Sequence, residues 1–583
     1  MNWEKLSRWK SLLAFQKRIP EAAAMSGDTQ ISPCRLALLT DFTPDFLASE
    51  LRKIAESSSL SLDIHLINPG NWQSEILQQE SALYTFNPDV VLIGCSGPMQ
   101  WSRFSSDRNT DPGLKLLEEY LQIWDTLRKR LPHVEIWQSE LGPFPDGLGD
   151  AVDPSSFSAQ RAIFNEGIFN ESSSRSHVSL VDWVSGIHQT GTRQAYDNRL
   201  WHTAAHPFAL DFLPELAKPI IKRLMWRSGR FIKVVVVDLD ETLWGGIVGD
   251  LGSSGIQIGQ EGIGNIFRHF QIWVKLLKHQ GILVAVASHN TEESARQAFD
   301  NPEHVLTLED FAAFRASWDP KSVMIREIAE ELNIGLDAFC FLDNSVFVRN
   351  EVRSALPQVS VPELPDDPSE WLEFLSSASL FESGTGSEAN AHRTRWIQEA
   401  GERDAKRQGF ENYEDYLSSL KMQGRLRSLK KEHIPRAHQL IMRTNQFNLR
   451  TIRHSKATLE KMLSSENWLS YFAGLEDCFG DYGWIGLLLI ERDSPESDCA
   501  FLDTWIMSCR VFERGMEYWT FTRLIEELRT RGISTLDAEF VPSAKNGKFS
   551  GLLGELGFTP TSGGRCRLDL TAAPLHETHI ESQ

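Results

Sequence analysis

Cysteine is scarce in this chain: 583 residues contain seven cysteines, and no two of them form a CxxC pair. A sparse, odd-numbered set argues against a disulfide framework and favours a reducing compartment. No apolar run approaches the roughly 18 residues that a membrane-spanning helix needs. Residues 1–27 carry charges throughout and lack the apolar core of a secretory signal. We therefore expect a cytoplasmic protein without membrane contact.

Positive charge is also in deficit, because 59 Lys and Arg face 79 Asp and Glu, which gives a formal net charge of −20. A general nucleic-acid binder needs a basic face, so this class of function is disfavoured. The sequence shows no internal repeat and no low-complexity run. It has an ordinary globular balance, 41% hydrophobic and 24% charged, over a length that predicts about two to four domains.

The order of apolar segments divides the chain into five regions. Strand-like runs such as "RLALLTDF" and "PDVVLIGCSG" alternate with helical patterns, and the alternation resumes from "FIKVVVVDLD", which predicts two parallel α/β sheets. The last region places neighbouring antiparallel strands before an amphipathic helix and a further strand, which predicts an α+β domain. The expected boundaries are an N-terminal helix at 1–30, an α/β domain at 31–215, a second α/β domain at 220–366, a polar helical connector at 367–430 and the α+β domain at 431–575.

The stretch "KVVVVDLDETLWGGIVGD" ends a buried strand with two carboxylates, Asp238 and Asp240. Four consecutive valines suit a strand that is covered on both faces. Sites in such sheets form at the carboxyl ends of the strands. Taken alone, the two aspartates fit either a polar strand end or a catalytic pair.

Three later residues stand at equivalent strand ends or helix starts: Ser288 ends "GILVAVAS", Lys321 opens the helix after "SWDP", and Asp343 ends "DAFCFLD". This ordered set favours phosphoryl transfer, in which one aspartate attacks phosphorus and the second acts as acid and base. Mg²⁺, which prefers carboxylate oxygens, would bind Asp238, Asp240 and Asp343. Lys321 and Ser288 would offset charge on the transferred group. Ser288 fits a cap of the following helix equally well.

This order of motifs resembles the haloacid dehalogenase (HAD) superfamily, and "DLDETLWGG", "WDPK" and "FLDN" are similar to its subfamily IIIC and the FkbH-like members. The resemblance implies that Asp238 is the nucleophile, Asp240 the acid/base and Asp343 a metal ligand, with phosphoryl contacts from Ser288 and Lys321. The substrate-binding residues expected from the same motifs are Thr242, Trp244, Gly245, Gly246 and Asn290. A plain tight turn is an equally good interpretation of the two glycines.

Both ends of the chain extend the resemblance to the long FkbH-like proteins. "SALYTF" followed by "NPDVVLIG" is similar to their N-terminal region, which is akin to the flavodoxin-like SGNH hydrolases. "RTNQFNLRTIR", "FGDYGWIG" and "AKNGKFSGLLGELGF" resemble an acetyltransferase-like (GNAT) region. The expected architecture is a Rossmann-like HAD domain between an SGNH-like α/β domain and a GNAT-like α+β domain. "LLTDFTP" lacks the Gly-Asp-Ser of a working SGNH site, so we expect the first domain to be non-catalytic.

The resemblance also implies a reaction. FkbH-like proteins of polyketide and related pathways take the glyceryl unit of 1,3-bisphosphoglycerate, a small glycolytic metabolite, and remove phosphate. They deliver glyceryl to the phosphopantetheine thiol of an acyl carrier protein. The family reaction implies passage through a cysteine thioester, and Cys509 in "SCRV" is the candidate acyl acceptor.

Several positions depart from the family pattern. "DNSVFVR" has Asn344 and Val348 where the family has Asp and Glu, which predicts weaker Mg²⁺ binding or altered contacts around the metal. "ASHN" has Ala287 and His289 in place of Cys and Lys. Glu513 stands at a glycine position of the GNAT pyrophosphate loop, where a carboxylate would repel phosphate.

Two alternatives therefore stay open beside the glyceryltransferase: a HAD phosphatase acting on another phosphorylated metabolite, and a catalytically weakened member that serves as a biosynthetic assembly partner. The departures favour the assembly partner, whereas the intact aspartates, serine and lysine favour an enzyme. The basic stretch "KMQGRLRSLKKEH" at 421–433 is expected to be a solvated helix face, with docking of an acidic carrier protein as the alternative.

Overall fold

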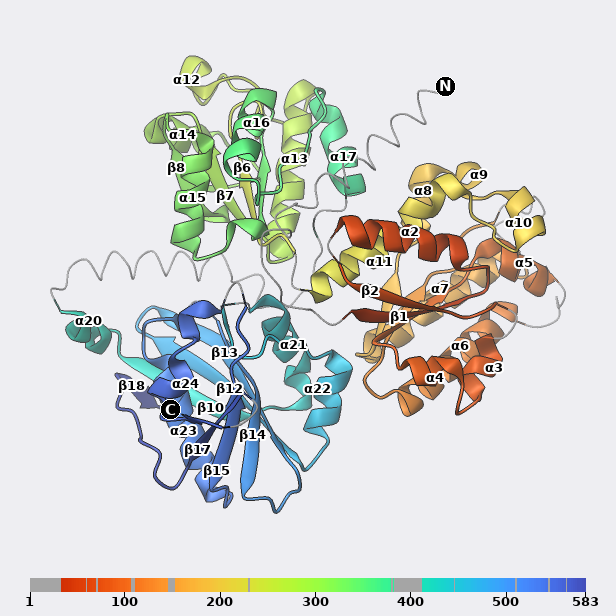
Figure 1. The fold of residues 1–583 in the computed structure, drawn as a ribbon. Helices are drawn as coiled ribbons and strands as arrows, with labels where there is room; N and C mark the ends of the chain where they lie inside the picture. Colours follow the sequence, from red (N-terminus) through yellow and green to blue (C-terminus); the bar gives the residue numbers. More distant parts are fainter. Residues whose placement is uncertain are drawn as a thin grey trace. The chain divides into compact units, whose positions relative to one another are not determined.

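A computed structural model describes residues 33–58, 60–69, 72–105, 111–144, 153–228, 231–378, 381, 412–444, 446–508, 511–543, 546–561 and 564–583. The chain forms two compact units, one made of Asp28–Met225 with His454–Lys461 and the other of Trp226–Arg453 with Met462–Gln583. Figure 1 shows the sheets and helices of each. The expected N-terminal helix, half of the connector and Cys509 lie outside the described residues. Within the described ranges, no helix is long and apolar enough to cross a membrane.

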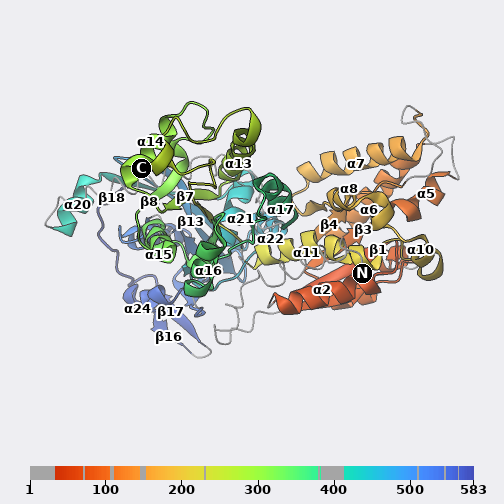
Figure 2. The ribbon, with the colours of Figure 1, turned by 90° about the horizontal axis from the view of Figure 1, so that it is seen from above.

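The N-terminal unit is built on a parallel sheet in the order β2-β1-β3-β4-β5. Side chains of β1 alternate between its faces, so Ala37 and Leu39 pack in the core with α6 and α7, whereas Leu36 and Leu38 are buried on the other face. Figure 2 shows α2 and α11 on the opposite side of the sheet from α7. The main elements are β1 (Cys34–Thr40), α2 (Asp45–Ser57), β2 (Leu62–Leu66), α3 (Trp72–Leu77), α4 (Ala82–Phe86), β3 (Val90–Gly94), α5 (Gly97–Ser105), α6 (Pro112–Arg130), β4 (Glu135–Ser139), α7 (Phe157–Ser174), β5 (Val178–Val181), α8 (Val184–Thr190), α9 (Thr192–Ala195), α10 (Asn198–Ala204) and α11 (Leu213–Arg227).

A short segment from much later in the sequence belongs to this N-terminal unit. The helix α22 (Lys456–Leu463) begins within it. The Ser455 hydroxyl donates to the His133 carbonyl (3.4 Å). The Glu460 carboxylate accepts from Arg128 (3.1 Å) and from the Ser176 hydroxyl. The unit is therefore assembled from two stretches that lie more than two hundred residues apart in sequence.

The second α/β region, which follows α11, has a parallel sheet in the order β8-β7-β6-β9. Val235 and Val237 of β6 face α13 and α17, whereas Val234 and Val236 face α15 and α16. The run of valines is therefore covered on both sides, as expected for a central parallel strand. The elements are β6 (Val234–Val237), α12 (Val248–Leu251), α13 (Gly262–His279), β7 (Leu283–Ser288), α14 (Glu292–Gln297), β8 (Phe311–Ala316), α15 (Lys321–Leu332), β9 (Phe339–Leu342), α16 (Val346–Ala355) and α17 (Trp371–Ala378).

The C-terminal region forms a mixed sheet in the order β16-β17-β15-β14-β13-β12-β10-β18, with β11 paired to β14. The expected antiparallel neighbours are β12, β13 and β14, and α23 is the expected amphipathic helix before β15. The elements are α20 (Tyr413–Ser419), β10 (Met422–Ser428), α21 (Ile434–Arg443), β11 (Phe447–Asn448), β12 (Trp468–Asp477), β13 (Gly480–Arg492), β14 (Cys499–Met507), α23 (Met516–Thr530), β15 (Thr535–Glu539), α24 (Leu552–Glu555), β16 (Thr559–Pro560), β17 (Arg565–Asp569) and β18 (Ile580–Ser582).

The basic stretch after residue 420 is a strand, not the solvated helix face that we expected. In β10, Met422 and Gly424 are buried while Gln423 and Arg427 are exposed. This period of two presents one face to the core of the sheet, where β10 pairs with β12. Arginines on the other face of β10 hid the alternation, and the sheet begins inside the region assigned to a connector.

Candidate active site

The central strand β6 delivers Asp238 to the carboxyl edge of the second α/β sheet. The valines of β6 are fully buried, and the Asp238 backbone N–H donates to the Leu342 carbonyl at the end of β9 (3.0 Å). β6 and β9 are parallel neighbours. The residue that follows β9, Asp343, therefore lies at the same edge as Asp238.

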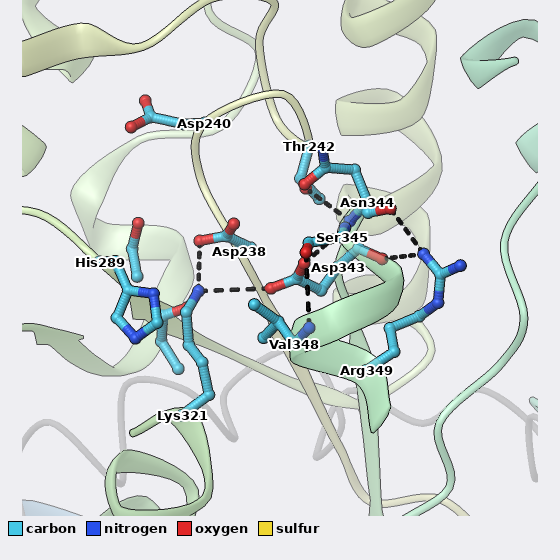
Figure 3. Close-up of polar contacts among 12 residues, drawn as sticks. Asp238, Asp240, Thr242, His289, Lys321, Asp343, Asn344, Ser345, Val348 and Arg349 are labelled. Atoms are coloured by element: carbon cyan, nitrogen blue, oxygen red, sulfur yellow. Dashed lines mark hydrogen bonds and ion pairs between the residues drawn. The ribbon is translucent and has the colours of Figure 1, made fainter. Parts of the chain in front are cut away.

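Lys321 joins these two aspartates (Figure 3). It is the first residue of α15, directly after Pro320, and its side chain is only 1% exposed. Its ammonium Nζ donates to Asp238 Oδ1 (2.6 Å), to the Ala287 carbonyl (2.7 Å) and, more weakly, to Asp343 Oδ2 (3.4 Å). A buried cation with three oxygen partners needs all of them, because an unpaired buried charge is costly. The distances make Lys321 the centre of the site.

Asp343 is fully buried beside a second carboxylate. Burial raises its pKa to about 6, and the negative charge of Asp238 adds to the rise, while Lys321 and a backbone hydrogen bond from Ser345 (2.8 Å) oppose it. Two acidic side chains that face one cation form an electron-rich pocket that a further cation would stabilise.

Asp240 does not join the other two carboxylates. Its Oδ1 accepts from Trp244 Nε1 (2.9 Å) and from the Val248 backbone N–H (3.0 Å), and its Oδ2 accepts from Asn290 Nδ2 (2.9 Å). Figure 3 shows its carboxylate apart from Asp238 and Lys321. Within the described residues, no group of three or more His, Cys, Asp or Glu side chains is placed to hold a metal ion. The expected set of three carboxylate ligands is thus not gathered among the described residues, because Trp244 and Val248 occupy Asp240 Oδ1 and Asn290 occupies Oδ2.

Ser288 and Asn290 stand beside Asp240 at the end of β7. Asn290 Nδ2 donates to the Ser288 hydroxyl (3.2 Å) as well as to Asp240, and both residues are buried. The side chain that caps α14 belongs to Thr291, which accepts from the Ser294 N–H. The capping interpretation of Ser288 is therefore wrong, and its hydroxyl lies at the carboxyl edge next to Asp240.

Thr242 is fully buried and ties the first motif to the last one. Its hydroxyl donates to Asn344 Oδ1 (3.4 Å) and accepts from the Asn344 backbone N–H (3.3 Å). The amide of Asn344 is thus held where the family has a carboxylate. Val348, the other departure here, packs its side chain on the core beside α15 and donates its backbone N–H to the Ser345 hydroxyl at the start of α16.

Trp244, Gly245 and Gly246 form a tight loop and present little surface. Trp244 is fully buried. A Cβ on Gly245 would lie 2.9 Å from the Gln257 amide oxygen, and Gly246 has a φ of +90° that favours glycine. The Gly246 N–H donates to the Glu241 carboxylate (2.8 Å). Of the two interpretations of these glycines, the geometry fits the tight turn.

The remaining departures have local explanations. The carbonyl of Ala287 holds Lys321, and His289 Nε2 lies 3.0 Å from the Asp319 carbonyl with its ring stacked on Trp318. His289 is therefore a polar residue at a strand end. In the C-terminal region, the Glu513 carboxylate pairs with Lys548 (3.0 Å).

Sequence reasoning missed Arg349. Its guanidinium is 2% exposed and donates to the backbone carbonyls of Asp343 (2.8 Å) and Asn344 (2.7 Å) and to the Glu363 carboxylate (3.0 Å). It fixes the turn that carries Asp343. The signal available in the sequence was a lone arginine six residues after the motif aspartate, on a helix whose other side packs in the core.

Comparisons with known proteins identify the family of this chain. A family model described as the N-terminal domain of FkbH matches residues 35–225. The crystal structure of the N-terminal part of a Bacteroides fragilis protein, which contains a phosphatase domain and was solved with Mg, is 32% identical. It matches with a TM-score of 0.58 over 63% of this chain and 98% of that one. The chain belongs to the FkbH-like phosphatases of the HAD superfamily.

Several other solved structures similar to this FkbH-like chain are acetyltransferases that match about a quarter of it. They include the ribosomal-protein-S18-alanine N-acetyltransferase of Escherichia coli, at 21% identity, 26% of this chain, 96% of that chain and a TM-score of 0.20. A spermidine N-acetyltransferase of Vibrio cholerae matches at 15% identity, 26% and 95% coverage and a TM-score of 0.21. No curated protein matches the chain.

The donor set of this FkbH-like site suits a hard divalent cation. Asp238 and Asp343 supply carboxylate oxygens on either side of Lys321, and Mg²⁺ prefers such oxygens over nitrogen or sulfur. The pKa of Asp343 is raised first by burial and then by the negative charge of Asp238. A bound cation would offset that repulsion, so the residues present fit the metal.

Proposed function

We propose that this protein is an Mg²⁺-dependent phosphatase and glyceryltransferase, which dephosphorylates a 1,3-bisphosphoglycerate-derived acyl unit and loads glyceryl onto an acyl carrier protein. The observation that carries the phosphatase part is the contact of Lys321 Nζ with Asp238 (2.6 Å) and Asp343 (3.4 Å) at one sheet edge. This arrangement presents a carboxylate nucleophile beside a fixed cation, which phosphoryl transfer requires.

In the first step, an Asp238 carboxylate oxygen attacks the phosphorus of the phosphate ester, so that the acyl phosphate is kept for the thiol. The bond from phosphorus to the leaving oxygen breaks, and that oxygen takes a proton from Asp240. In the second step, Asp240 removes a proton from water, which attacks the aspartyl-phosphate and releases inorganic phosphate with Asp238 restored. Lys321 and the Ser288 hydroxyl offset the charge of the phosphoryl oxygens throughout.

Asp238 and Asp343 are the residues that would hold Mg²⁺, and Asn344 replaces a carboxylate that the family has nearby. When bound, the cation supplies charge neutralisation at the phosphoryl oxygens. Thr242 and Arg349 keep the turn that carries Asp343 in place. The loss of one carboxylate at Asn344 predicts weaker binding of the metal than in a relative that has both.

The glyceryl step needs a carrier protein with a phosphopantetheine arm. Its thiolate would attack the acyl carbon, the bond from that carbon to the phosphate oxygen would break, and a thioester would form with release of phosphate. Cys509 is the candidate intermediate acceptor, in which case a second thiol exchange delivers the glyceryl group. We propose a cytoplasmic setting and neither nucleic-acid nor membrane partners.

A plain phosphatase is the second candidate, and one observation favours it. The position where the family has a cysteine is Ala287, which is fully buried and uses its carbonyl on Lys321. No acyl group can be attached there. A phosphatase that releases its product to water needs no such acceptor, and its substrate would be a different phosphorylated metabolite.

One experiment separates the candidates. The protein is incubated with Mg²⁺, 1,3-bisphosphoglycerate and a holo-carrier protein, and intact masses and free phosphate are measured for wild type, Asp238→Asn and the control Asp300→Asn, an exposed aspartate of the same sheet region. A glyceryl adduct that only Asp238→Asn loses supports the glyceryltransferase. Phosphate release without an adduct supports the plain phosphatase. No release from the wild type contradicts the glyceryltransferase. If the wild type also releases no phosphate from p-nitrophenyl phosphate, the plain phosphatase is contradicted and the assembly partner is left.

A further inference from the structure

The Trp-Gly-Gly loop, which we expected to bind substrate, is aimed at Asp240 instead. Trp244 has no exposed surface, and the one polar atom of its side chain donates to Asp240 Oδ1 at 2.9 Å. The turn through Gly245 and Gly246 brings the Val248 backbone N–H to the same oxygen at 3.0 Å. Two donors from one loop therefore converge on a single carboxylate oxygen.

The indole of Trp244 is held rigidly. Phe299 and His304 contact it edge-to-face, with ring centroids 5.5 and 5.3 Å away. Behind it, the buried amide of Gln271 donates to the Leu243 carbonyl (2.8 Å) and accepts from the backbone N–H of Leu306 (3.1 Å). The direction of the indole N–H is thus set by packing, which pre-organises the hydrogen bond.

The other oxygen of Asp240 has a different environment. Oδ2 accepts from Asn290 Nδ2 (2.9 Å), and the same amide group donates to the Ser288 hydroxyl (3.2 Å). Asn290 therefore places Oδ2 on the side of Ser288, which the proposed function assigns to the phosphoryl group. With two N–H donors, Oδ1 has both in-plane lone pairs occupied and cannot also carry a proton.

We propose that Trp244 is a positioning residue which, with the Val248 amide, saturates Asp240 Oδ1, so that the acid proton sits on Oδ2 and faces the leaving-group oxygen. The inference rests on the proposed role of Asp240. During transfer, the Oδ2–H bond breaks, the proton joins the leaving oxygen as its bond to phosphorus breaks, and Asp240 is left as a carboxylate. Without the indole donor, the proton can reside on Oδ1 and point away from the substrate.

Leaving groups that differ in their need for a proton test this assignment. Glycerol 3-phosphate loses an alkoxide that must be protonated, whereas p-nitrophenyl phosphate loses a phenolate that leaves without help. General acid catalysis contributes about 10²–10⁴-fold where it is needed. kcat/KM covers only the steps up to departure of the leaving group, so the later role of Asp240 as a base does not enter the ratio.

We expect Trp244→Phe to lower kcat/KM for glycerol 3-phosphate by at least about 10-fold and for p-nitrophenyl phosphate by no more than about 3-fold. Trp371→Phe is the matched control, because Trp371 is equally buried and donates its indole N–H to the Pro365 carbonyl, away from Asp240. It should change kcat/KM for both substrates by the same factor. If Trp244 had a merely structural role, Trp244→Phe would lower kcat/KM for both substrates equally, and that result would overturn the proposal.

A second variant covers the case in which Trp244→Phe does not fold. Asn290→Ala leaves the tryptophan packed and removes the donor to Oδ2 and to Ser288. It should lower kcat/KM for both substrates, because Ser288 loses a contact. It should lower kcat/KM for glycerol 3-phosphate at least about 5-fold more than that for p-nitrophenyl phosphate. An equal effect on the two substrates contradicts the assignment. Failure of the proposed function itself is distinct, because the wild type would then hydrolyse neither substrate.

Discussion

Replacing Lys321 by methionine removes the cation that joins the two buried aspartates. Methionine has a similar length and fits the apolar part of the side chain, so the change deletes mainly the charge and its three hydrogen bonds. Asp238 and Asp343 would then face each other without a partner cation. We expect the metal-free protein to be strongly destabilised.

The magnitude follows from burial. Lys321 is 1% exposed, Asp343 is 1% exposed and Asp238 is 13% exposed. Removing one member of a buried ionic group costs about 3–5 kcal/mol, because the remaining charge stays desolvated. For a region of this size each 1 kcal/mol shifts the melting temperature by about 2–4 °C, which gives a loss of about 10 °C. At acid pH the loss should shrink, because Asp343, with a pKa of about 6, becomes neutral.

The measurement is calorimetry of the full chain in EDTA at pH 7 and pH 5, with Lys278→Met as the control. Lys278 also pairs with an aspartate, Asp310, at 2.6 Å, but it is 19% exposed and Lys275 lies near the same carboxylate. The control should therefore melt within about 3 °C of the wild type. If Lys321→Met melts like the control at pH 7, the reasoning about unpaired carboxylates is wrong.

Three further predictions concern the same region. The raised pKa of Asp343 predicts that the metal-free protein loses stability as pH rises from about 4 to about 6, and Asp343→Asn should remove that slope in EDTA melts. Arg349→Met deletes the bonds to two motif carbonyls and should cost about 3 kcal/mol in chemical unfolding, whereas Arg353→Met, at a 38% exposed arginine, should cost less than about 1 kcal/mol. Gly246→Ala places a Cβ 2.5 Å from a leucine methyl at φ +90° and should lower the melting temperature more than Gly252→Ala, where φ is +68° but nothing lies within 4 Å.

Much of the architecture followed from periodicity alone. Runs of valine and alanine mark strands covered on both faces, and parallel strands bring their carboxyl ends to one edge. For that reason the sequence alone predicts that Asp238, Asp343 and Lys321 lie close together, as they do in the structure. The FkbH-like resemblance supplied the superfamily, which the match to the Bacteroides fragilis structure supports.

The features that could not be predicted depend on the orientation of side chains and on contacts between segments that are separated in the sequence. The orientation of Asp240 is set by Trp244, and no pattern of residue types shows where an indole N–H points. The role of Arg349 requires the chain to come back at Glu363. In β10, basic side chains on the exposed face outweighed the weak signal of Met422 and Gly424 on the buried one.

The helix that returns to the N-terminal unit affects how this protein could recombine during evolution. A gene segment ending anywhere between the two stretches encodes every strand of the first sheet but not Glu460, the partner of Arg128 and Ser176. If such a segment were exchanged between genes, Arg128 and Ser176 would lose Glu460 and face the residues of another protein. The C-terminal gene half, in turn, would carry a helix start evolved for a surface that it no longer meets. We therefore expect the two parts of the gene to be inherited together, because the contacts of Glu460 join them although their sheets are separate.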